Sequence, residues 1–363
     1  MFYKKLVSEI ISKGFKLNPY DPCVANVDIN GKQITVTWHV DDVKSSHIDS
    51  QVNDKFRDWC EQKYGSDKIG HVKAVRGERH DYLGMILDYS KPHALQIDMK
   101  YYIKAMEEEF PYPVKRTKVA PWNDKLFKVD NSLKKLDDEK RMMFHRFVMK
   151  TMFLCKRGRP DVSPGVSFLS TRVKAPNQGD WKKLLKILGF LFATIDDLLT
   201  LEADDFQTLT WYIDAAFAVH ADMKSHTGST FTLGKSAICS NSTKQKVNAR
   251  SSTESELVGV DDKIAKVVWT KKFIECQGFK VKLNIVYQDN QSTIKLENNG
   301  KESSGKRTRH FDIKYFYVTD LISRDEVKVI YCPTDNMVAD YMSKPLVGHK
   351  FKKFRDIIMN LEG

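Results

Sequence analysis

Residues 209–219 have the sequence Leu-Thr-Trp-Tyr-Ile-Asp-Ala-Ala-Phe-Ala-Val, with Asp214 near the middle. Aromatic and β-branched side chains dominate this run, which predicts a strand. Residues 227–239 predict two further short strands that break at Gly234, because glycine interrupts a strand pattern. The three strands together predict a meander with Asp214 in its first strand.

A long helix is predicted after this meander. Ser251 or Ser252 can cap it, and apolar side chains then recur at helical spacing as far as Val268. Glu256 falls in the first turns of this helix. Glu254 competes with Glu256 as the acid that this helix presents to a site. Residues two apart on a helix point to different faces, so the two cannot both face one site.

The rest of the chain predicts two more strands. Residues 283–287 form a fourth strand that ends at Asp289, residues 327–331 form a fifth, and residues 336–343 open the last helix. The expected order is three strands, helix, strand, helices, strand, helix. The first and fourth strands have to lie side by side for Asp214 and Asp289 to meet.

Four carboxylates thus stand in the settings that a two-metal nuclease site needs: Asp214, Glu256, Asp289 and Asp340. Acidic side chains brought together from distant parts of a chain repel one another unless a cation lies between them. Any one of them alone is more often a solvated surface charge. Their placement at strand ends and helix starts favours Mg²⁺ binding and phosphodiester hydrolysis.

Roughly the last 150 residues resemble the ribonuclease H domain of copia-type retrotransposon polyproteins. The blocks that carry the resemblance are Asp214-Ala215, Ser225-His226-Thr227-Gly228, Lys244-Gln245-Lys246, Ser251-Ser252-Thr253-Glu254-Ser255-Glu256, Asp289-Asn290-Gln291-Ser292, Lys306-Arg307-Thr308-Arg309-His310-Phe311-Asp312, and Ala339-Asp340 with Ser343-Lys344-Pro345-Leu346.

This resemblance implies a fold and an activity. The fold is a mixed five-stranded sheet with flanking helices. The activity is cleavage of an RNA strand paired to DNA, with two Mg²⁺ ions, or Mn²⁺ as a substitute, held by Asp214, Glu256, Asp289 and Asp340. Glu256 is preferred over Glu254 because apolar Leu257 and Val258 follow it, as in related domains.

A second acidic feature lies near the start of the chain. Residues 34–43 are strand-forming and place Asp41 and Asp42 at a turn, as a polymerase palm does when it presents metal ligands from a hairpin. The signal is weak alone, since Asp-Asp occurs at positions 41, 137, 196, 204 and 261. The strand pattern on both sides distinguishes the first of these pairs.

The region between the two acidic features extends the resemblance. Residues 82–89 predict a strand, residues 99–110 a helix, and residues 159–162 lead into a segment at 166–170. This succession resembles the rear half of a copia-type reverse transcriptase: metal-binding hairpin, primer grip and connection. The expected fold class is α/β (α+β), a truncated reverse-transcriptase palm and connection followed by the ribonuclease H-like sheet.

One departure from that family bears on polymerase activity. A third aspartate, well upstream of the paired acids, completes the polymerase metal site in the family, and only forty residues precede Asp41 here. Residues 2–11 predict an amphipathic helix of the middle palm, so the chain is expected to start inside a domain. His39 stands where tyrosine is common, and Trp38 adds bulk. We expect RNA-directed DNA polymerase activity to be lost by truncation.

Four segments are expected. They are a partial palm and primer-grip region at 1–112, a connection or thumb-like region at 113–205, a ribonuclease H-like domain at 206–350 and a basic C-terminal tail at 351–363. The polar stretch around Pro121 marks the first boundary, and the acids at 203–205 mark the second.

Composition indicates a polyanionic partner. The chain has 59 Lys and Arg against 47 Asp and Glu, a formal charge of +12. Basic clusters occur at 115–118, 150–159, 182–186 and 301–314, the last with interleaved aromatic residues suited to stacking. The residues predicted to bind nucleic acid are Lys306, Arg307, Arg309, His310 and Lys314. For His310, a phosphate contact or a packed side chain is favoured over a metal-ligand or general-base role.

Cysteine usage and hydropathy exclude other classes. The six cysteines have no metal-type spacing and no close pair, which indicates reduced thiols in the cytoplasm or nucleus. The most apolar window, residues 184–201, carries Lys186, Asp196 and Asp197, so no membrane span is expected. The N-terminus lacks the long apolar core of a signal peptide.

The predicted function is Mg²⁺-dependent endonucleolytic hydrolysis of RNA in RNA–DNA hybrids, within a retrotransposon fragment whose partners are nucleic acid and other parts of the polyprotein. Two alternatives stay open. One is a nucleic-acid-binding remnant without chemistry, and the other is a polymerase subunit that borrows its missing parts from another chain.

Overall fold

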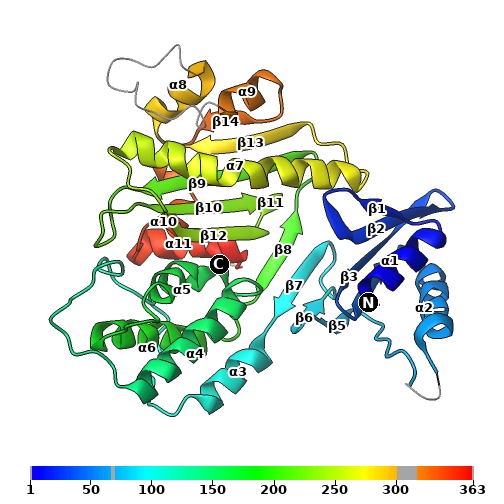
Figure 1. The fold of residues 1–363 in the computed structure, drawn as a ribbon, viewed down its shortest axis with the longest axis horizontal. Coiled ribbons are helices and arrows are strands. Elements are labelled where there is room, and N and C mark those ends of the chain that lie inside the picture. The colour runs from blue at the N-terminus through cyan, green and yellow to red at the C-terminus, as the bar shows by residue number, and fades with distance from the viewer. Residues whose placement is uncertain (1, 67–69, 301–316, 362–363) are drawn as a thin grey trace.

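The computed structural model describes residues 2–66, 70–300 and 317–361, and these contain three sheets with helices packed around them (Figure 1). The α/β class expected from the sequence is confirmed. No helix in these ranges is both long enough and apolar enough to cross a membrane.

The N-terminal unit is a four-stranded antiparallel sheet with two helices on one face. Its elements are α1 (Phe2–Ser12), β1 (Lys16–Asn18), β2 (Asp21–Ile29), β3 (Lys32–His39), β4 (Asp42–Ser46) and α2 (Ser50–Tyr64). Ile34, Val36 and Trp38 alternate along β3 and share one face, where they are buried with Ile10 of α1 and Phe56 of α2. The apolar side of the predicted N-terminal helix therefore packs on this sheet.

The second sheet contains five antiparallel strands from distant parts of the chain. They are β5 (Arg79–Tyr82), β6 (Met85–Asp88), β7 (Ala94–Asp98), β8 (Leu199–Ala203) and β11 (Gly234–Lys235). The prediction of one strand over residues 82–89 is wrong. Leu83 and Gly84 have φ angles of 53° and 73°, so the chain makes a two-residue hairpin turn there.

A helical layer packs beside this sheet and forms the largest core. It contains α3 (Lys100–Glu109), α4 (Asp138–Cys155), η1 (Pro160–Val162), α5 (Ser163–Ser170), α6 (Gln178–Ala193) and α11 (Gly348–Met359). The predicted basic tail at 351–363 begins inside α11. Phe351, Phe354 and Ile358 recur at helical spacing and are buried in this core.

A buried ion network fixes α11 to η1. The carboxylate of Asp161 accepts hydrogen bonds from Arg159 and from Arg355, each with a nitrogen–oxygen distance of 2.9 Å. Although burial raises the pKa of Asp161, the two guanidinium groups lower it to about 2. The last helix is therefore held by charge as well as by apolar packing.

The third sheet has the strand order β12-β10-β9-β13-β14. Its strands are β9 (Thr208–Ala216), β10 (His226–Thr232), β12 (Cys239–Lys244), β13 (Leu283–Gln288) and β14 (Lys328–Tyr331). The first three are antiparallel, and β13 runs parallel to both β9 and β14. The expected mixed five-stranded sheet is confirmed, with its first and fourth strands side by side.

The third strand of this sheet lies later in the sequence than predicted. Gly234 has a φ of 121°, and Gly234 and Lys235 pair with β8 in the second sheet. The meander closes with β12 instead. The predicted boundary at residues 203–205 follows β8, which pairs with strands from both sides of it, so packing crosses this boundary. The four-segment division of the chain stays a prediction.

Helices cover both faces of the third sheet. Successive residues of β10 point to opposite faces. Thr227 contacts Gly259 of α7 (Ser252–Cys276), whereas Gly228 lies against Ala339 and Ser343 at α10 (Asp340–Ser343). A side chain at Gly228 would collide with this backbone. The remaining elements, α8 (Gln291–Asn299), α9 (Tyr317–Ser323) and η4 (Thr334–Asn336), lie toward the β14 edge.

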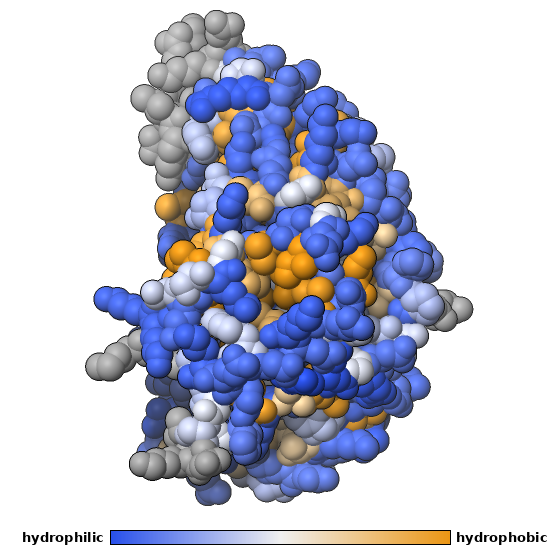
Figure 2. All heavy atoms as spheres, turned by 90° about the vertical axis from the view of Figure 1, so that its right-hand side faces the viewer, coloured by the Kyte–Doolittle hydropathy of each residue, from blue (hydrophilic) through white to orange (hydrophobic). Residues whose placement is uncertain are grey.

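The N-terminal unit contacts the far end of α7, as Figure 1 shows. Trp269 donates from its indole nitrogen to the carbonyl oxygen of Tyr20 at 2.8 Å, and Asn18 donates to that of Phe273 at 3.3 Å. The face shown in Figure 2 is mostly hydrophilic, with an apolar area near its middle. This surface agrees with the strongly charged composition.

Candidate functional site: an acidic cluster at the end of two parallel strands

Strand pairing brings Asp214 and Asp289 to the same level. In the parallel pair β9–β13, Tyr212 is opposite Tyr287, and each aspartate follows two residues later. Residues two apart on a strand lie on the same face, so each aspartate shares the face of its tyrosine, which packs with Cys332, Met337 and Ala339 on the α10 side of the sheet. Asp214 is 1% exposed and Asp289 is half-buried. Strand register is therefore the reason that these two acids meet.

Glu256 completes a group of three acids. Asp214, Glu256 and Asp289 each offer a carboxylate oxygen, and these oxygens all lie within 4.8 Å of one another. Glu256 is 5% exposed, and Gln288 donates a hydrogen bond to it at 3.4 Å. Within the described ranges, no other group of three or more His, Cys, Asp or Glu meets this criterion.

The competing residue Glu254 has a different place. Ser251 caps α7 by accepting a hydrogen bond from the Glu254 backbone nitrogen at 3.1 Å. The Glu254 carboxylate turns back to accept from the backbone nitrogen of Arg250 at 2.6 Å. Its side chain therefore stabilises the start of the helix, while Glu256 lies within the acidic group.

Asp340 lies next to this group, and the ammonium group of Lys344 links the two. The ammonium nitrogen of Lys344 is 2.5 Å from Asp340 Oδ1 and 3.3 Å from Asp214 Oδ1. The hydroxyl of Ser343 donates to Asp214 Oδ2. Both oxygens of Asp214 are thus engaged by the segment that follows Asp340.

Burial and mutual repulsion change the pKa values of these groups. Burial raises the pKa of Asp214, and burial together with Asp214 and Asp289 raises that of Glu256 well above its usual range. Burial and Asp214 raise the pKa of Asp340 to about 6. Although burial lowers the pKa of Lys344, Asp214 and Asp340 raise it. The surrounding protein therefore stabilises the ionised forms of these acids only in part.

This donor set fits a hard divalent cation. Carboxylate oxygens are the ligands that Mg²⁺ prefers, and a cation would offset the repulsion that raises these pKa values. Asp214, Glu256 and Asp289 are the residues that would hold it. The predicted assignment of Asp214, Glu256, Asp289 and Asp340 as catalytic and metal-binding residues stays a prediction.

Asp41 and Asp42 lie elsewhere and do not join this cluster. Val40 has a φ of 57° and is 69% exposed at the β3–β4 turn, where both aspartates are exposed. No third acid of the described ranges joins them in a group that could hold a metal ion. Their role as metal ligands stays a prediction.

The predicted nucleic-acid-binding residues lie outside the described part of the chain. They are Lys306, Arg307, Arg309, His310 and Lys314. Two contacts at the acidic site were not predicted from the sequence, those of Ser343 and Lys344. The spacing of Asp340 and Lys344, four residues apart at a helix, is the signal that could have indicated their ion pair.

Comparison with curated proteins shows relatives along nearly the whole chain. The chain is 25% identical to the Retrovirus-related Pol polyprotein from transposon TNT 1-94 of Nicotiana tabacum, over 98% of this chain and 27% of that protein. It is 29% identical to the Pol polyprotein from transposon RE2 of Arabidopsis thaliana, over 54% of this chain and 14% of that protein. Its homologues are Pol polyproteins of Ty1/copia-type retrotransposons.

This homology confirms the resemblance that the sequence blocks indicated. A further copia-type relative, the Transposon Ty1-NL2 Gag-Pol polyprotein of Saccharomyces cerevisiae, is 22% identical over 88% of this chain and 19% of its own length. The chain thus spans about a quarter or less of these Pol polyproteins. No family model matches the sequence.

One solved structure is similar in shape. It is the foamy viral protease-reverse transcriptase in complex with an RNA/DNA hybrid, with a TM-score of 0.48 and 12% identity over 82% of this chain and 36% of that chain. The fold of this chain is established by its own strand order and register, and not by the likeness to that structure.

Proposed function

We propose that this chain is a ribonuclease H-type endonuclease that hydrolyses the RNA strand of RNA–DNA hybrids with Mg²⁺, or with Mn²⁺ as a substitute. The observation that carries this proposal is the convergence of Asp214, Glu256 and Asp289, whose carboxylate oxygens lie within 4.8 Å of one another. Homology to retrotransposon Pol polyproteins supports a role in nucleic-acid processing. The net charge of +12 suits a polyanionic substrate.

The acids provide the chemistry that phosphodiester hydrolysis needs. Divalent ions held there would lower the pKa of attacking water and stabilise the charge on the leaving oxygen. Asp214 is the central ligand because it belongs to the group with Glu256 and Asp289 and is also linked to Asp340 through the ammonium group of Lys344. The rigid strands β9 and β13 fix two of these carboxylates, which favours a preorganised site.

Neighbouring residues orient Asp214. The Ser343 hydroxyl donates to one of its oxygens, and Lys344 lies 3.3 Å from the other. These contacts fix the rotation of the carboxylate and reduce the repulsion between Asp214 and Asp340. Ser343 and Lys344 are therefore positioning residues for the acids.

The test is an Asp289→Asn variant assayed on a hybrid labelled in its RNA strand. The substitution removes a negative ligand at constant size, so we expect cleavage to fall about a hundredfold or more while hybrid binding in EDTA is kept. Asp262→Asn is the matched control, because Asp262 is exposed on α7 outside the cluster. Cleavage by the Asp289→Asn variant at the parent rate would refute the proposal.

Two comparisons sharpen this assay. Single-stranded RNA and double-stranded DNA of the same sequence should be cleaved far more slowly than the hybrid. An unmodified chain that binds the hybrid but leaves it intact in Mg²⁺ and in Mn²⁺ would favour a binding remnant without chemistry.

A further inference from the structure

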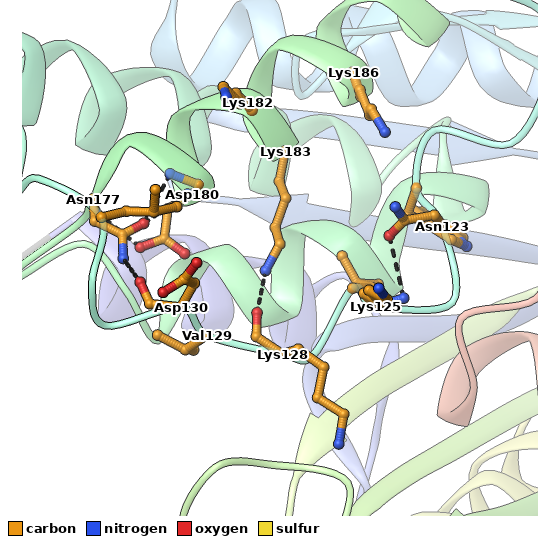
Figure 3. Close-up of a pocket in the computed structure, with 14 residues that line it drawn as sticks. Asn123, Lys125, Lys128, Val129, Asp130, Asn177, Asp180, Lys182, Lys183 and Lys186 are labelled. Carbon is orange, nitrogen blue, oxygen red and sulfur yellow. Dashed lines mark hydrogen bonds between the residues drawn. The ribbon is translucent and has the colours of Figure 1, made fainter.

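A lysine-rich cavity lies away from the acidic cluster, between the start of α6 and the loop that precedes α4. Its volume is about 350 Å³. The lysines that line it are Lys125, Lys128, Lys182, Lys183 and Lys186. Figure 3 shows Lys183 extending from α6 to the loop, where its ammonium group donates to the carbonyl oxygen of Lys128 at 2.6 Å. We call this feature the lysine cavity.

The positive charge of the lysine cavity is not balanced by its own acids. Asp130 accepts hydrogen bonds from the backbone and hydroxyl of Ser132 at 3.0 and 2.6 Å. Asp180 accepts a hydrogen bond from the backbone nitrogen of Asn177, the N-cap of α6, at 3.0 Å and forms an ion pair with Arg172 at 3.1 Å. Across residues 2–66, 70–300 and 317–361, none of the five lysines forms an ion pair with a carboxylate. The cavity therefore favours an anionic ligand.

The interior of the cavity is apolar. Trp122 and Leu126 are buried in its wall, and Val129 and Leu133 are half-buried. Burial lowers the pKa of Lys183 to about 8, so a bound anion would stabilise its charged form. An apolar floor with a cationic rim suits a ligand that joins an uncharged sugar or base to a phosphate, and the volume holds one nucleotide unit.

The lysine cavity belongs to the same packed body as the acidic cluster. The indole nitrogen of Trp122 donates to the carbonyl oxygen of Leu346 at 2.9 Å, two residues beyond Lys344. Phe127 stacks on His226 of β10 with a centroid separation of 4.7 Å, and β10 pairs with β9 beside Asp214. A strand held in the cavity would thus be fixed relative to the acids.

We propose that the lysine cavity binds the phosphodiester backbone of a nucleic-acid strand, with one sugar–phosphate unit inside it. The choice of a nucleic-acid strand rests on the proposed function. The binding itself requires neither cleavage nor a divalent ion.

The test is a double variant, Lys125→Gln with Lys186→Gln, which removes two exposed charges from the cavity rim. Binding of a fluorescent RNA–DNA hybrid is measured in EDTA over a range of salt concentrations. We expect the dissociation constant to rise several-fold and the slope of log affinity against log salt to become shallower by about 2, since each lost phosphate contact removes about 0.9. Lys4→Gln with Lys63→Gln is the control of equal charge, on the N-terminal unit.

Three outcomes would overturn the proposal. Unchanged binding would show that the strand does not enter the cavity, and equal loss in both double variants would show an effect of net charge alone. Loss of nucleoside monophosphate binding with unchanged hybrid binding would assign the cavity to a free nucleotide. Because these measurements are made in EDTA, they are independent of the Asp289→Asn assay, and either proposal can fail alone.

Discussion

Two regions of this molecule present groups of acids, and they differ in every property that matters for a metal site. Asp41 and Asp42 are neighbours in sequence, and both are exposed at a turn. Asp214, Glu256 and Asp289 come from two strands and a helix, and their oxygens meet within 4.8 Å. Adjacency in sequence spreads two carboxylates outward into water. The convergence of two strands and a helix brings the carboxylates of Asp214, Glu256 and Asp289 close together.

Burial changes the electrostatic properties of one of these two groups of acids. Water screens the repulsion between the exposed carboxylates of Asp41 and Asp42. In the buried group, burial and neighbouring charges raise the pKa values of Asp214 and Glu256. The buried group of acids therefore gains more from a divalent cation than the exposed pair does.

The largest effect is expected from replacing Glu254 and Glu256 of α7 one at a time. Glu256→Gln removes a buried ligand and should reduce hybrid cleavage about a hundredfold or more, whereas Glu254→Gln should leave most of the activity. Calorimetric titration with Mg²⁺ should show the same contrast in affinity. Loss of activity in the Glu254→Gln variant, with activity kept in the Glu256→Gln variant, would reverse the assignment.

A buried acid with protein counter-charges should respond to pH. The pKa of Asp161 is about 2 in the folded protein, below the value of about 3.9 in an unfolded chain, so ionised Asp161 stabilises the fold above pH ~4. This stabilisation is lost as the pH falls toward 2. Asp161→Asn should lower the free energy of unfolding by about 3 kcal/mol at pH 7, since it leaves the buried Arg159 without its carboxylate and leaves Arg355 with Asp197 alone.

Urea unfolding from pH 5 to pH 2 checks this prediction. The difference in stability between the parent and the Asp161→Asn variant should shrink as the pH falls. A difference that is constant across this range would show that Asp161 is not ionised in the folded state.

A smaller effect is expected from replacing Lys344, whose ammonium group lies beside the acidic cluster. Lys344→Met removes the ammonium group between Asp214 and Asp340, and should lower stability in EDTA by on the order of 2 kcal/mol. Mg²⁺ should recover more stability in this variant than in the parent, because it binds a less compensated group of acids. Lys352→Met, at an exposed position on α11, is the control. Equal Mg²⁺ responses in the parent and both variants would contradict this role.

The exposed pair should give the smallest effect. Asp41→Asn combined with Asp42→Asn is expected to leave hybrid cleavage nearly unchanged, because neither residue lies in the acidic cluster. The parent chain should incorporate no labelled nucleotide on a primed RNA template. Incorporation that disappears in the double variant would show a working polymerase site. Asp41 and Asp42 would then be functional acids like those of the acidic cluster.

The sequence predicted the third sheet well because its signals are local. Alternation and β-branched content predicted β9, β13 and β14, and the apolar spacing after Ser251 predicted α7. Once these elements are correct, parallel pairing alone brings Asp214 and Asp289 together. The choice of Glu256 over Glu254 agrees with the capping geometry of Ser251.

The failures have long-range or backbone causes. The hairpin inside residues 82–89 depends on Leu83, a residue that seldom adopts positive φ and gives no turn signal. The departure of residues 234–235 to another sheet depends on pairing with β8. The burial of α11 depends on Asp161, which lies 194 residues before Arg355. The ion pairs of Lys344 depend on the position of α10 against β9 and β10.

The position of α11 also imposes an order on biosynthesis. Phe190 packs against Phe351 with a centroid separation of 5.9 Å, and Asp161 obtains its second arginine only from residue 355. At 5–20 residues per second, a ribosome needs about 10 to 40 s to add the 194 residues between Asp161 and Arg355. During this interval Phe190 of α6 lacks its contact with Phe351 and Asp161 lacks its second arginine, so a nascent chain is more exposed to aggregation and chaperone capture until α11 emerges.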